Sequence, residues 1–202
     1  MSHTVPATIS TTDTEPELEG VLHLPDSTPA PGVVICHPHP LYGGDMDNYV
    51  VAALCRALVA ADFAALRFNF RGVGASQGNH DGRIGERSDA RRALDWLGNH
   101  ESVDPERLAI AGYSFGAIVA SSPLESARVV VAVSPPALAN PATTRPLLIV
   151  TANKTPSPGR PTSRRQRARP AHALRSSPTR ITSGRGDLTR SAGWLPPSCT
   201  SR

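Results

Sequence analysis

The residues best suited to chemistry in this sequence form the run Gly112-Tyr-Ser-Phe-Gly116, which follows the apolar segment 108–111. Glycines two positions before and after Ser114 allow this serine to occupy a strained turn between a strand and a helix. Such a turn lifts the hydroxyl above the edge of a sheet and aims the N–H of Phe115 at a developing oxyanion. The pattern predicts Ser114 as the nucleophile of an acyl-transfer reaction. The alternative is a glycine-rich turn that carries a solvated serine.

A second candidate segment is His37-Pro-His-Pro-Leu-Tyr-Gly-Gly44, directly after the apolar run 32–36. A loop in this position supplies the other oxyanion N–H when a serine on a neighbouring strand is the nucleophile. The two prolines of the loop have no N–H to donate. We therefore expect the donor to be Leu41 or Tyr42.

Three ring side chains are expected to line the pocket: His37, His39 and Tyr113. The two histidines also raise the possibility of a metal site. Their i,i+2 spacing, with no matching carboxylate or further ligand, is poor support for it. We therefore predict no metal ion and no cofactor, and a pocket-lining or structural role for both histidines.

A third motif runs from Arg67 to Gly78 (RFNFRGVGASQG) and is followed by Asp81-Gly-Arg-Ile-Gly-Glu86 and Asp89. It describes a buried strand that ends in a glycine loop and leads into the charged start of a helix. We expect Arg71 to balance Glu86 or Asp89 as a structural ion pair rather than to contact substrate.

Hydrophobic patterning supplies the elements that must hold these motifs. Short apolar runs are typical of strands buried on both faces of a parallel sheet, and a 3.6-residue period is typical of amphipathic helices. The patterns predict strands at 18–24, 32–36, 63–70, 107–111, 129–133 and 147–151, and helices at 49–61, 86–97 and 115–122. This alternation predicts an α/β fold with a doubly wound, mostly parallel sheet.

The charge distribution divides the chain at about residue 154. Residues 1–154 carry 11 Lys and Arg against 16 Asp and Glu, a net charge of −5, whereas residues 155–202 carry 10 Arg and one acid, a net charge of +9. The second segment also holds 8 Ser and 7 Pro. A segment of this composition buries too little apolar surface to offset its ordering entropy. We expect a flexible segment 1–17, a domain over 18–154 and a disordered tail over 155–202.

Composition also indicates the cellular compartment of the protein and the class of its partners. The three cysteines show no metal-binding spacing, and their odd number without a secretory leader favours a reducing cytoplasm. No run approaches 18 apolar residues, so we expect no membrane span. The basic character belongs to the tail alone, which makes nucleic acid a less favoured partner than a small-molecule acyl substrate. The sequence leaves the oligomeric state open.

The three motifs in this order (HPHPLYGGDMDN, RFNFRGVGASQG, GYSFG) resemble the small bacterial α/β-hydrolases grouped near the dienelactone hydrolases, over residues 18–154. The resemblance implies an α/β-hydrolase fold and a lidless or nearly lidless serine hydrolase of ester or other acyl substrates, with a Ser–Asp–His triad. It implies Ser114 as nucleophile and the loop 37–44 as the oxyanion wall.

The rest of such a triad does not carry over to this chain. The acid of the family follows the strand that corresponds to 146–151, where this sequence continues Ala-Asn-Lys-Thr-Pro, and its histidine follows a final strand. Only His172 and Asp187 remain as candidates, both in Arg-, Ser- and Pro-rich surroundings that would not orient a base. We therefore expect the last strand and helix of the fold to be missing. An out-of-frame translation of a GC-rich gene would produce such a change of composition.

Two functions follow from this departure. The first is a serine hydrolase that forms an acyl-enzyme at Ser114 with little or no turnover, because a serine hydroxyl without an oriented base is a poor nucleophile. The alternative is a catalytically inactive α/β-hydrolase-fold binding protein that keeps the pocket. A further alternative is that the Arg-rich tail binds phosphate non-specifically.

Overall fold

A computed structural model describes residues 3–10, 15–136 and 143–151, which belong to one unit of the chain. In chain order the elements are β1 (His3–Ile9), β2 (Leu18–Leu24), β3 (Ala30–Cys36), the 3-10 helix η1 (Pro40–Tyr42), α1 (Tyr49–Ala60), β4 (Ala64–Phe68), α2 (Ile84–Gly98), β5 (Val103–Tyr113), α3 (Phe115–Ala120), β6 (Val129–Val133) and β7 (Leu147–Val150). The strands form a seven-stranded sheet in the order β1-β2-β4-β3-β5-β6-β7. β4, β3, β5, β6 and β7 are parallel, and β1 and β2 are antiparallel to their neighbours.

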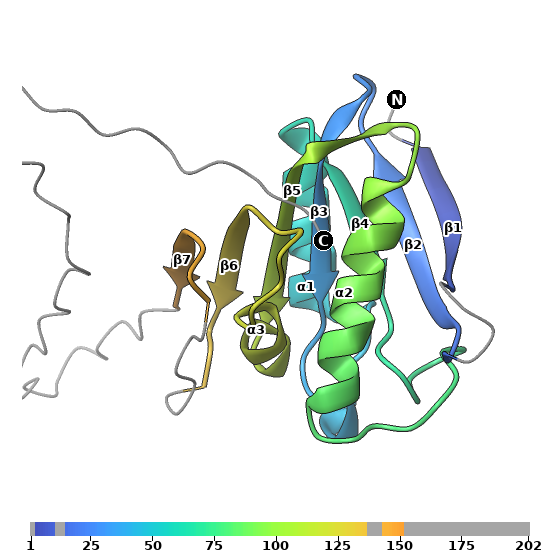
Figure 1. Cartoon of the computed structure of the whole chain (residues 1–202), viewed down its shortest axis with the longest axis vertical. Helices are drawn as coiled ribbons and strands as arrows, with labels where there is room; N and C mark the ends of the chain where they lie inside the picture. Colours follow the sequence, from blue (N-terminus) through green and yellow to red (C-terminus); the bar gives the residue numbers. More distant parts are fainter. Residues whose placement is uncertain (1–2, 11–14, 137–142, 152–202) are drawn as a thin grey trace, which may run out of the picture. The chain divides into compact units, whose positions relative to one another are not determined.

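Helices cover both faces of the sheet, as the alternating pattern predicts. Figure 1 shows α2 and α3 on one face and α1 on the other. The larger apolar core lies under α2 and α3 and includes Leu94, Leu97 and Val119. The smaller core lies under α1 around Val51 and Cys55. The sheet is therefore doubly wound and mostly parallel, and each predicted strand and helix over 18–151 is present.

The N-terminal segment differs from the sequence-based expectation of a flexible start. His3–Ile9 forms β1, which pairs with all of β2. Ala7 and Ile9 point into the core, 5% and 0% exposed. Pro6 is tolerated because β1 lies at the edge of the sheet, where a missing N–H faces solvent. Residues 1–2 and 11–14 lie outside the described part.

The parallel strands end at one edge of the sheet, and the predicted motifs lie there. Cys36 at the end of β3 pairs with Gly112 near the end of β5, and Ile35 pairs with Arg67 in β4. The loop 37–48 after β3, the loop 69–83 after β4 and Ser114 after β5 therefore meet at this edge.

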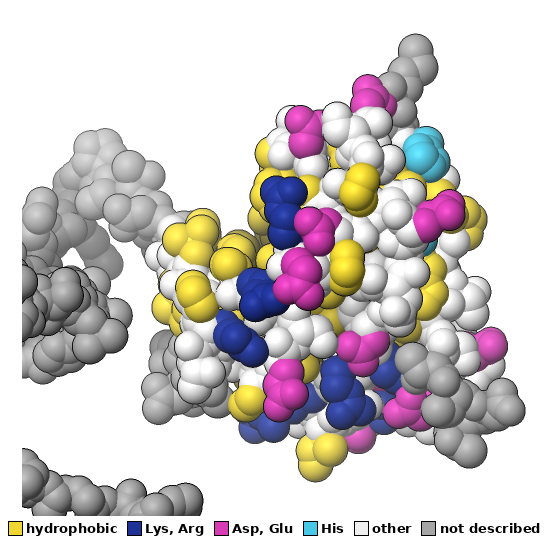
Figure 2. All heavy atoms as spheres, turned by 45° about the horizontal axis from the view of Figure 1, so that its top comes forward, with side chains coloured by type: hydrophobic (Ala, Val, Ile, Leu, Met, Phe, Trp, Pro, Cys, Tyr) yellow, Lys and Arg dark blue, Asp and Glu magenta, His cyan; other side chains and the backbone are white. Residues whose placement is uncertain are grey.

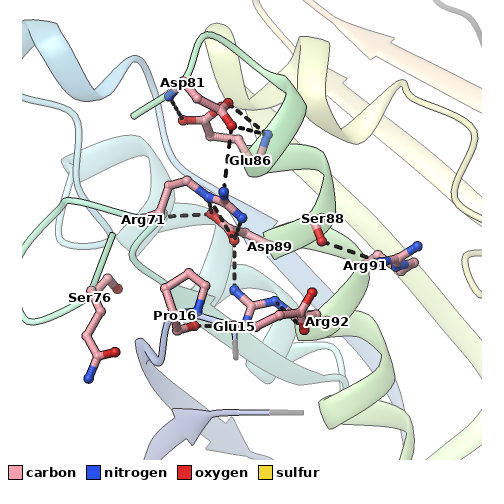
Figure 3. Close-up of polar contacts among 12 residues, drawn as sticks. Glu15, Pro16, Arg71, Ser76, Asp81, Glu86, Ser88, Asp89, Arg91 and Arg92 are labelled. Carbon is pink, nitrogen blue, oxygen red and sulfur yellow. Dashed lines mark hydrogen bonds and ion pairs between the residues drawn. The ribbon is translucent and has the colours of Figure 1, made fainter. Parts of the chain in front are cut away.

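A buried ion cluster fixes the loop after β4 to α2 (Figure 3). Asp89 of α2 is 0% exposed and accepts from both Arg71, at 2.8 Å, and Arg92, at 2.8 Å. Arg71 also donates its backbone N–H to Asp89 at 3.0 Å and lies 3.6 Å from Asp81. Arg92 donates to the carbonyl of Pro16 at 2.7 Å. The predicted ion pair of Arg71 with Asp89 is therefore confirmed as a structural contact.

The edge of the sheet formed by β7, on the other side from β1, exposes apolar side chains. Leu148, Ile149 and Val150 of β7 and Val129 of β6 are between 40% and 56% exposed. Figure 2 shows hydrophobic side chains gathered on the left, at the β7 end of the domain. The tail 155–202 and the expected loss of a final strand and helix lie outside the described residues.

We predict that Asp89→Ala lowers the free energy of unfolding by about 3–5 kcal/mol, because it leaves the buried guanidinium of Arg92 and the half-buried guanidinium of Arg71 without their shared carboxylate. Urea unfolding of the full chain measures this change. Asp95→Ala is the matched control, since Asp95 lies on the same helix but is exposed, and its carboxylate accepts from the exposed Ser126. A loss for Asp89→Ala no larger than the loss for Asp95→Ala would contradict the structural role of the cluster.

Candidate active site

Ser114 lies at the turn between β5 and α3 and has φ 55° and ψ −112°. A positive φ is unfavourable for a residue with a Cβ and is typical of strained functional turns. The backbone of the turn is held on one side by the N–H of Ser114, which donates to the carbonyl of Val133 at 2.9 Å. Ser114 is half-buried. Its position is the one that the glycine-flanked motif predicts for a nucleophile.

Both glycines of the motif lie where a side chain would not fit. A Cβ at Gly112 would overlap the backbone carbonyl of Gly116. A Cβ at Gly116 would overlap the carbonyl of Cys36 and come within 2.6 Å of the carbonyl oxygen of His37. The start of α3 therefore packs directly on the end of β3, and the turn at Ser114 adjoins the loop 37–44.

The loop 37–44 closes on itself through its own N–H groups. Leu41 donates to Nδ1 of His39 at 3.3 Å, and Tyr42 donates to the carbonyl of His39 at 3.1 Å. Gly43 and Gly44 donate to the carbonyls of Pro40 and His39, each at 3.1 Å. The N–H groups of Leu41 and Tyr42, predicted as oxyanion donors, are thus engaged within η1. Their side chains are 72% and 87% exposed.

The side chain of His39 packs against the residue that follows Ser114. Its ring lies 4.6 Å from the ring of Phe115, the residue after Ser114. It also lies 4.9 Å from the ring of Tyr42. Burial, and then the nearby His80, lower the pKa of His39, while Glu86 opposes them. Both prolines of the loop lack an N–H, and the N–H groups of residues 41–44 are engaged within the loop.

His37 is fully buried and holds the loops from inside rather than forming a pocket wall. Its Nε2 accepts the N–H of Phe70 at 3.1 Å, and its Nδ1 lies 2.6 Å from the carbonyl of Pro38. These two partners require a neutral ring with its proton on Nδ1. Burial lowers the pKa of His37 to about 4, although the Pro38 carbonyl raises it in part. His37 thus ties the end of β3 to the loop after β4.

Tyr113 precedes Ser114 and is half-buried. Burial raises the pKa of its phenol, and the adjacent Tyr49 at the start of α1 raises it further. Tyr49 is itself exposed. The predicted pocket-lining role of Tyr113 is compatible with this position beside the turn.

The structure adds one pair that the sequence analysis missed. His80 Nδ1 lies 2.6 Å from Oε1 of Glu86, whose side chain is 0% exposed. The ring of His80 lies 5.0 Å from His39 and 5.8 Å from Phe115. The hydrophobic pattern predicted that a helix begins at Glu86. Its pairing with His80 depends on a turn through Gly82 and Arg83, both with positive φ, which no periodicity reveals.

A groove of about 480 Å³ opens beside this pair, between the loops after β3 and β4. Its lining includes Leu41, Gly44, Asn69, Gly72 and His80. Within the described ranges no cluster of three or more His, Cys, Asp or Glu side chains could hold a metal ion. No helix in those ranges is long and apolar enough to cross a membrane. His172 and Asp187 lie outside the described residues.

We predict that the free energy of unfolding falls by about 2 kcal/mol between pH 7 and pH 5 because of His37 alone. The folded-state pKa of about 4 lies below the ordinary value of 6.5. The unfolded chain therefore takes up a proton in this range while folded His37 stays neutral, and stability is lost as the pH falls. Urea unfolding at several pH values measures the slope. His37→Gln should remove this part of the slope, and His3→Gln, at an exposed position, should leave it because His37 is retained; equal slopes in all three proteins would contradict the assignment.

We predict that Gly116→Ala lowers the free energy of unfolding by about 1–3 kcal/mol, because the added Cβ forces the start of α3 away from β3. Gly98→Ala in α2 is the control. Its Cβ would meet only the end of the Leu108 side chain, at 3.0 Å, and alanine is favoured over glycine in a helix. Thermal unfolding of both variants tests the difference, and equal stabilities would show that the close approach is not a constraint.

Comparisons with known proteins agree with this geometry. A sequence model of the alpha/beta hydrolase family matches residues 33–199. An α/β serine hydrolase homologue from Coxiella burnetii is 34% identical, with a TM-score of 0.64 and coverage of 73% of each chain. A lidless α/β serine hydrolase from Xanthomonas campestris is 31% identical, with a TM-score of 0.64 over 73% of this chain and 70% of that chain.

A curated relative, an uncharacterized protein of Rickettsia prowazekii, is 44% identical over 106 residues, which are 52% of this chain and 44% of that protein. The chain thus spans less than half the length of that relative. The family match and the two solved structures nevertheless agree on the fold. The chain has the α/β-hydrolase fold and belongs to the alpha/beta hydrolase family.

Proposed function

We propose that this protein is a serine hydrolase whose Ser114 forms an acyl-enzyme with an ester or other acyl substrate. The observation that carries the proposal is the strained backbone of Ser114 at the carboxyl edge of the sheet, against the loop 37–44. A positive φ at a serine flanked by two indispensable glycines is costly, and such strain is typical of a nucleophile turn.

In the proposed reaction, Ser114 Oγ attacks the acyl carbonyl and the resulting oxyanion is stabilised by two backbone N–H groups. Phe115 supplies one, because the first N–H groups of a helix have no acceptor within the helix. We propose His39 as the second donor in place of Leu41 and Tyr42, whose N–H groups bond within η1. Each such donor contributes about 3 kcal/mol to lowering the barrier. Collapse of this intermediate breaks the ester bond and expels the alcohol, which leaves with the proton lost by Ser114. Water then adds to the acyl-enzyme and releases the acid, which restores the serine hydroxyl.

The proposed mechanism has no identified base to accept the proton of Ser114. Beyond β7 the sequence offers only His172 and Asp187 as histidine and acid. Loss of triad members lowers turnover by about 10⁴–10⁶-fold, while an oxyanion hole and substrate binding retain about 10³–10⁴-fold over water. We therefore propose a slow enzyme.

The three sequence motifs support membership of the group near the dienelactone hydrolases. The family match supports a small-molecule substrate. The groove of about 480 Å³ beside His80 does not include Ser114 in its lining. The absence of any carboxylate between Ser134 and Asp187 favours one alternative, a catalytically inactive member of the family that binds acyl compounds without turnover. The cytoplasm as its compartment stays a sequence-based prediction.

We predict that a fluorophosphonate probe labels Ser114 slowly in the full chain and that Ser114→Ala abolishes the labelling. Labelling requires both a nucleophilic hydroxyl and a place for the developing charge on the phosphoryl oxygen. Mass spectrometry of the labelled peptide locates the adduct. Ser126→Ala, which removes an exposed serine bonded to Asp95, is the matched control and should label like the parent.

Two other outcomes would reject the hydrolase. Equal labelling of Ser114→Ala would place the reactive group elsewhere. No labelling at all, together with thermal stabilisation by a short-chain acyl ester that remains intact, would favour the inactive binding protein.

A further inference from the structure

We propose that His80, held by Glu86, is a positioning residue that sets the relative placement of the His39 and Phe115 backbones. The inference deepens the proposed function and rests on it, since these are the two proposed oxyanion donors. His80 comes from the loop after β4, so it adds a third strand's loop to a site otherwise built from β3 and β5.

Three rings form a closed cluster in which each contacts the other two. The ring centroids of His39 and Phe115 are 4.6 Å apart, those of His39 and His80 are 5.0 Å apart, and those of His80 and Phe115 are 5.8 Å apart. Offset and tilted ring pairs at these separations are favourable contacts. His80 therefore touches the side chains of both residues whose N–H groups the oxyanion would need.

His80 can fix these rings because it is itself fixed. Its side chain is 15% exposed, and Nδ1 lies 2.6 Å from the fully buried Glu86 carboxylate. Glu86 Oε2 accepts the N–H of Arg83 at 2.7 Å, and Oε1 accepts the N–H of Asp81 at 3.3 Å. Glu86 lies in the first turn of α2, the helix that also carries the buried Asp89. The ring of His80 is thus tethered to a rigid element.

The loop 37–44 needs such a support because its outer residues give it little packing. Leu41 and Tyr42 are among the most exposed large side chains of the described domain. Oxyanion donors must lie within about 2.7–3.1 Å of the oxygen to be effective. The half-buried ring of His39 packs against Phe115 and His80 and, beside the ties made by His37 and Gly116, helps to fix where the outer part of this loop stands relative to Ser114.

Three variants of the full chain test the assignment. His80→Ala removes the ring and its bond to Glu86, whereas His80→Phe restores a ring of similar size without that bond. His100→Ala is the matched control, because His100 is also half-buried, stacks on Trp96 at 5.8 Å and accepts a backbone N–H from Ser102. The readouts are the rate of fluorophosphonate labelling at Ser114, kcat and KM with p-nitrophenyl acetate, and the backbone amide residual dipolar couplings of His39 and Phe115 measured by NMR.

We expect His80→Ala to lower the labelling rate and kcat at least tenfold while KM stays within twofold, because the donors act on the oxyanion rather than on the bound ester. His80→Phe should recover at least fivefold of that loss. His100→Ala should match the parent. A loss in His80→Ala no larger than in His100→Ala would overturn the proposal, and so would a loss confined to KM.

The NMR comparison separates this inference from the proposed function. If the parent protein neither labels nor hydrolyses the ester, the hydrolase proposal fails. The relative orientation of the two backbones is still measured by the amide residual dipolar couplings of His39 and Phe115. His80→Ala should change both couplings and His100→Ala neither; unchanged couplings in His80→Ala would overturn the positioning role whatever the activity.

Discussion

The close approach of Gly116 to the end of β3 is the contact on which the site depends. The backbone of α3 can lie against the carbonyls of Cys36 and His37 only because residue 116 has no side chain. The approach also requires β3 and β5 to be adjacent, parallel and level at their carboxyl ends, as the pairing of Cys36 with Gly112 shows. Once these conditions are met, the turn at Ser114 and the loop 37–44 share one edge of the sheet.

Polar side chains add to the packing of Phe70 and Phe115 in holding the loops at this edge. His37 bonds two backbone groups, Asp89 bonds Arg71 at both its side chain and its N–H, and Glu86 bonds the N–H of Arg83. Loops beside a substrate cannot bury much apolar surface, since the edge must stay open. Buried groups with several hydrogen bonds fix a loop within a small volume, at the cost of strong dependence on each partner.

The sequence predicted the elements far better than the contacts among their loops. The apolar run Val129–Val133 matches the observed strand residue for residue, because its valines favour an extended strand. The sequence analysis did not predict β1, because its inward residues Ala7 and Ile9 are few and lie beside polar positions. No pattern in the sequence indicates that the N–H groups of Leu41 and Tyr42 bond within their own loop. The contact of His80 with Glu86 passes through two left-handed residues, a backbone feature without a sequence period.

Acyl transfer requires two parts, and the proposed mechanism places one of them in the described residues. In that mechanism the turn after β5 and the loop after β3 stabilise charge on the carbonyl oxygen. The other part, removal of the serine proton, belongs in this fold to residues that follow the strands at the β7 end. Stabilising the oxyanion and moving the proton contribute separately to the barrier, so a scaffold with the first part alone still polarises an acyl carbonyl. The change of composition near residue 154 therefore falls between the segments to which the proposed mechanism assigns these two parts.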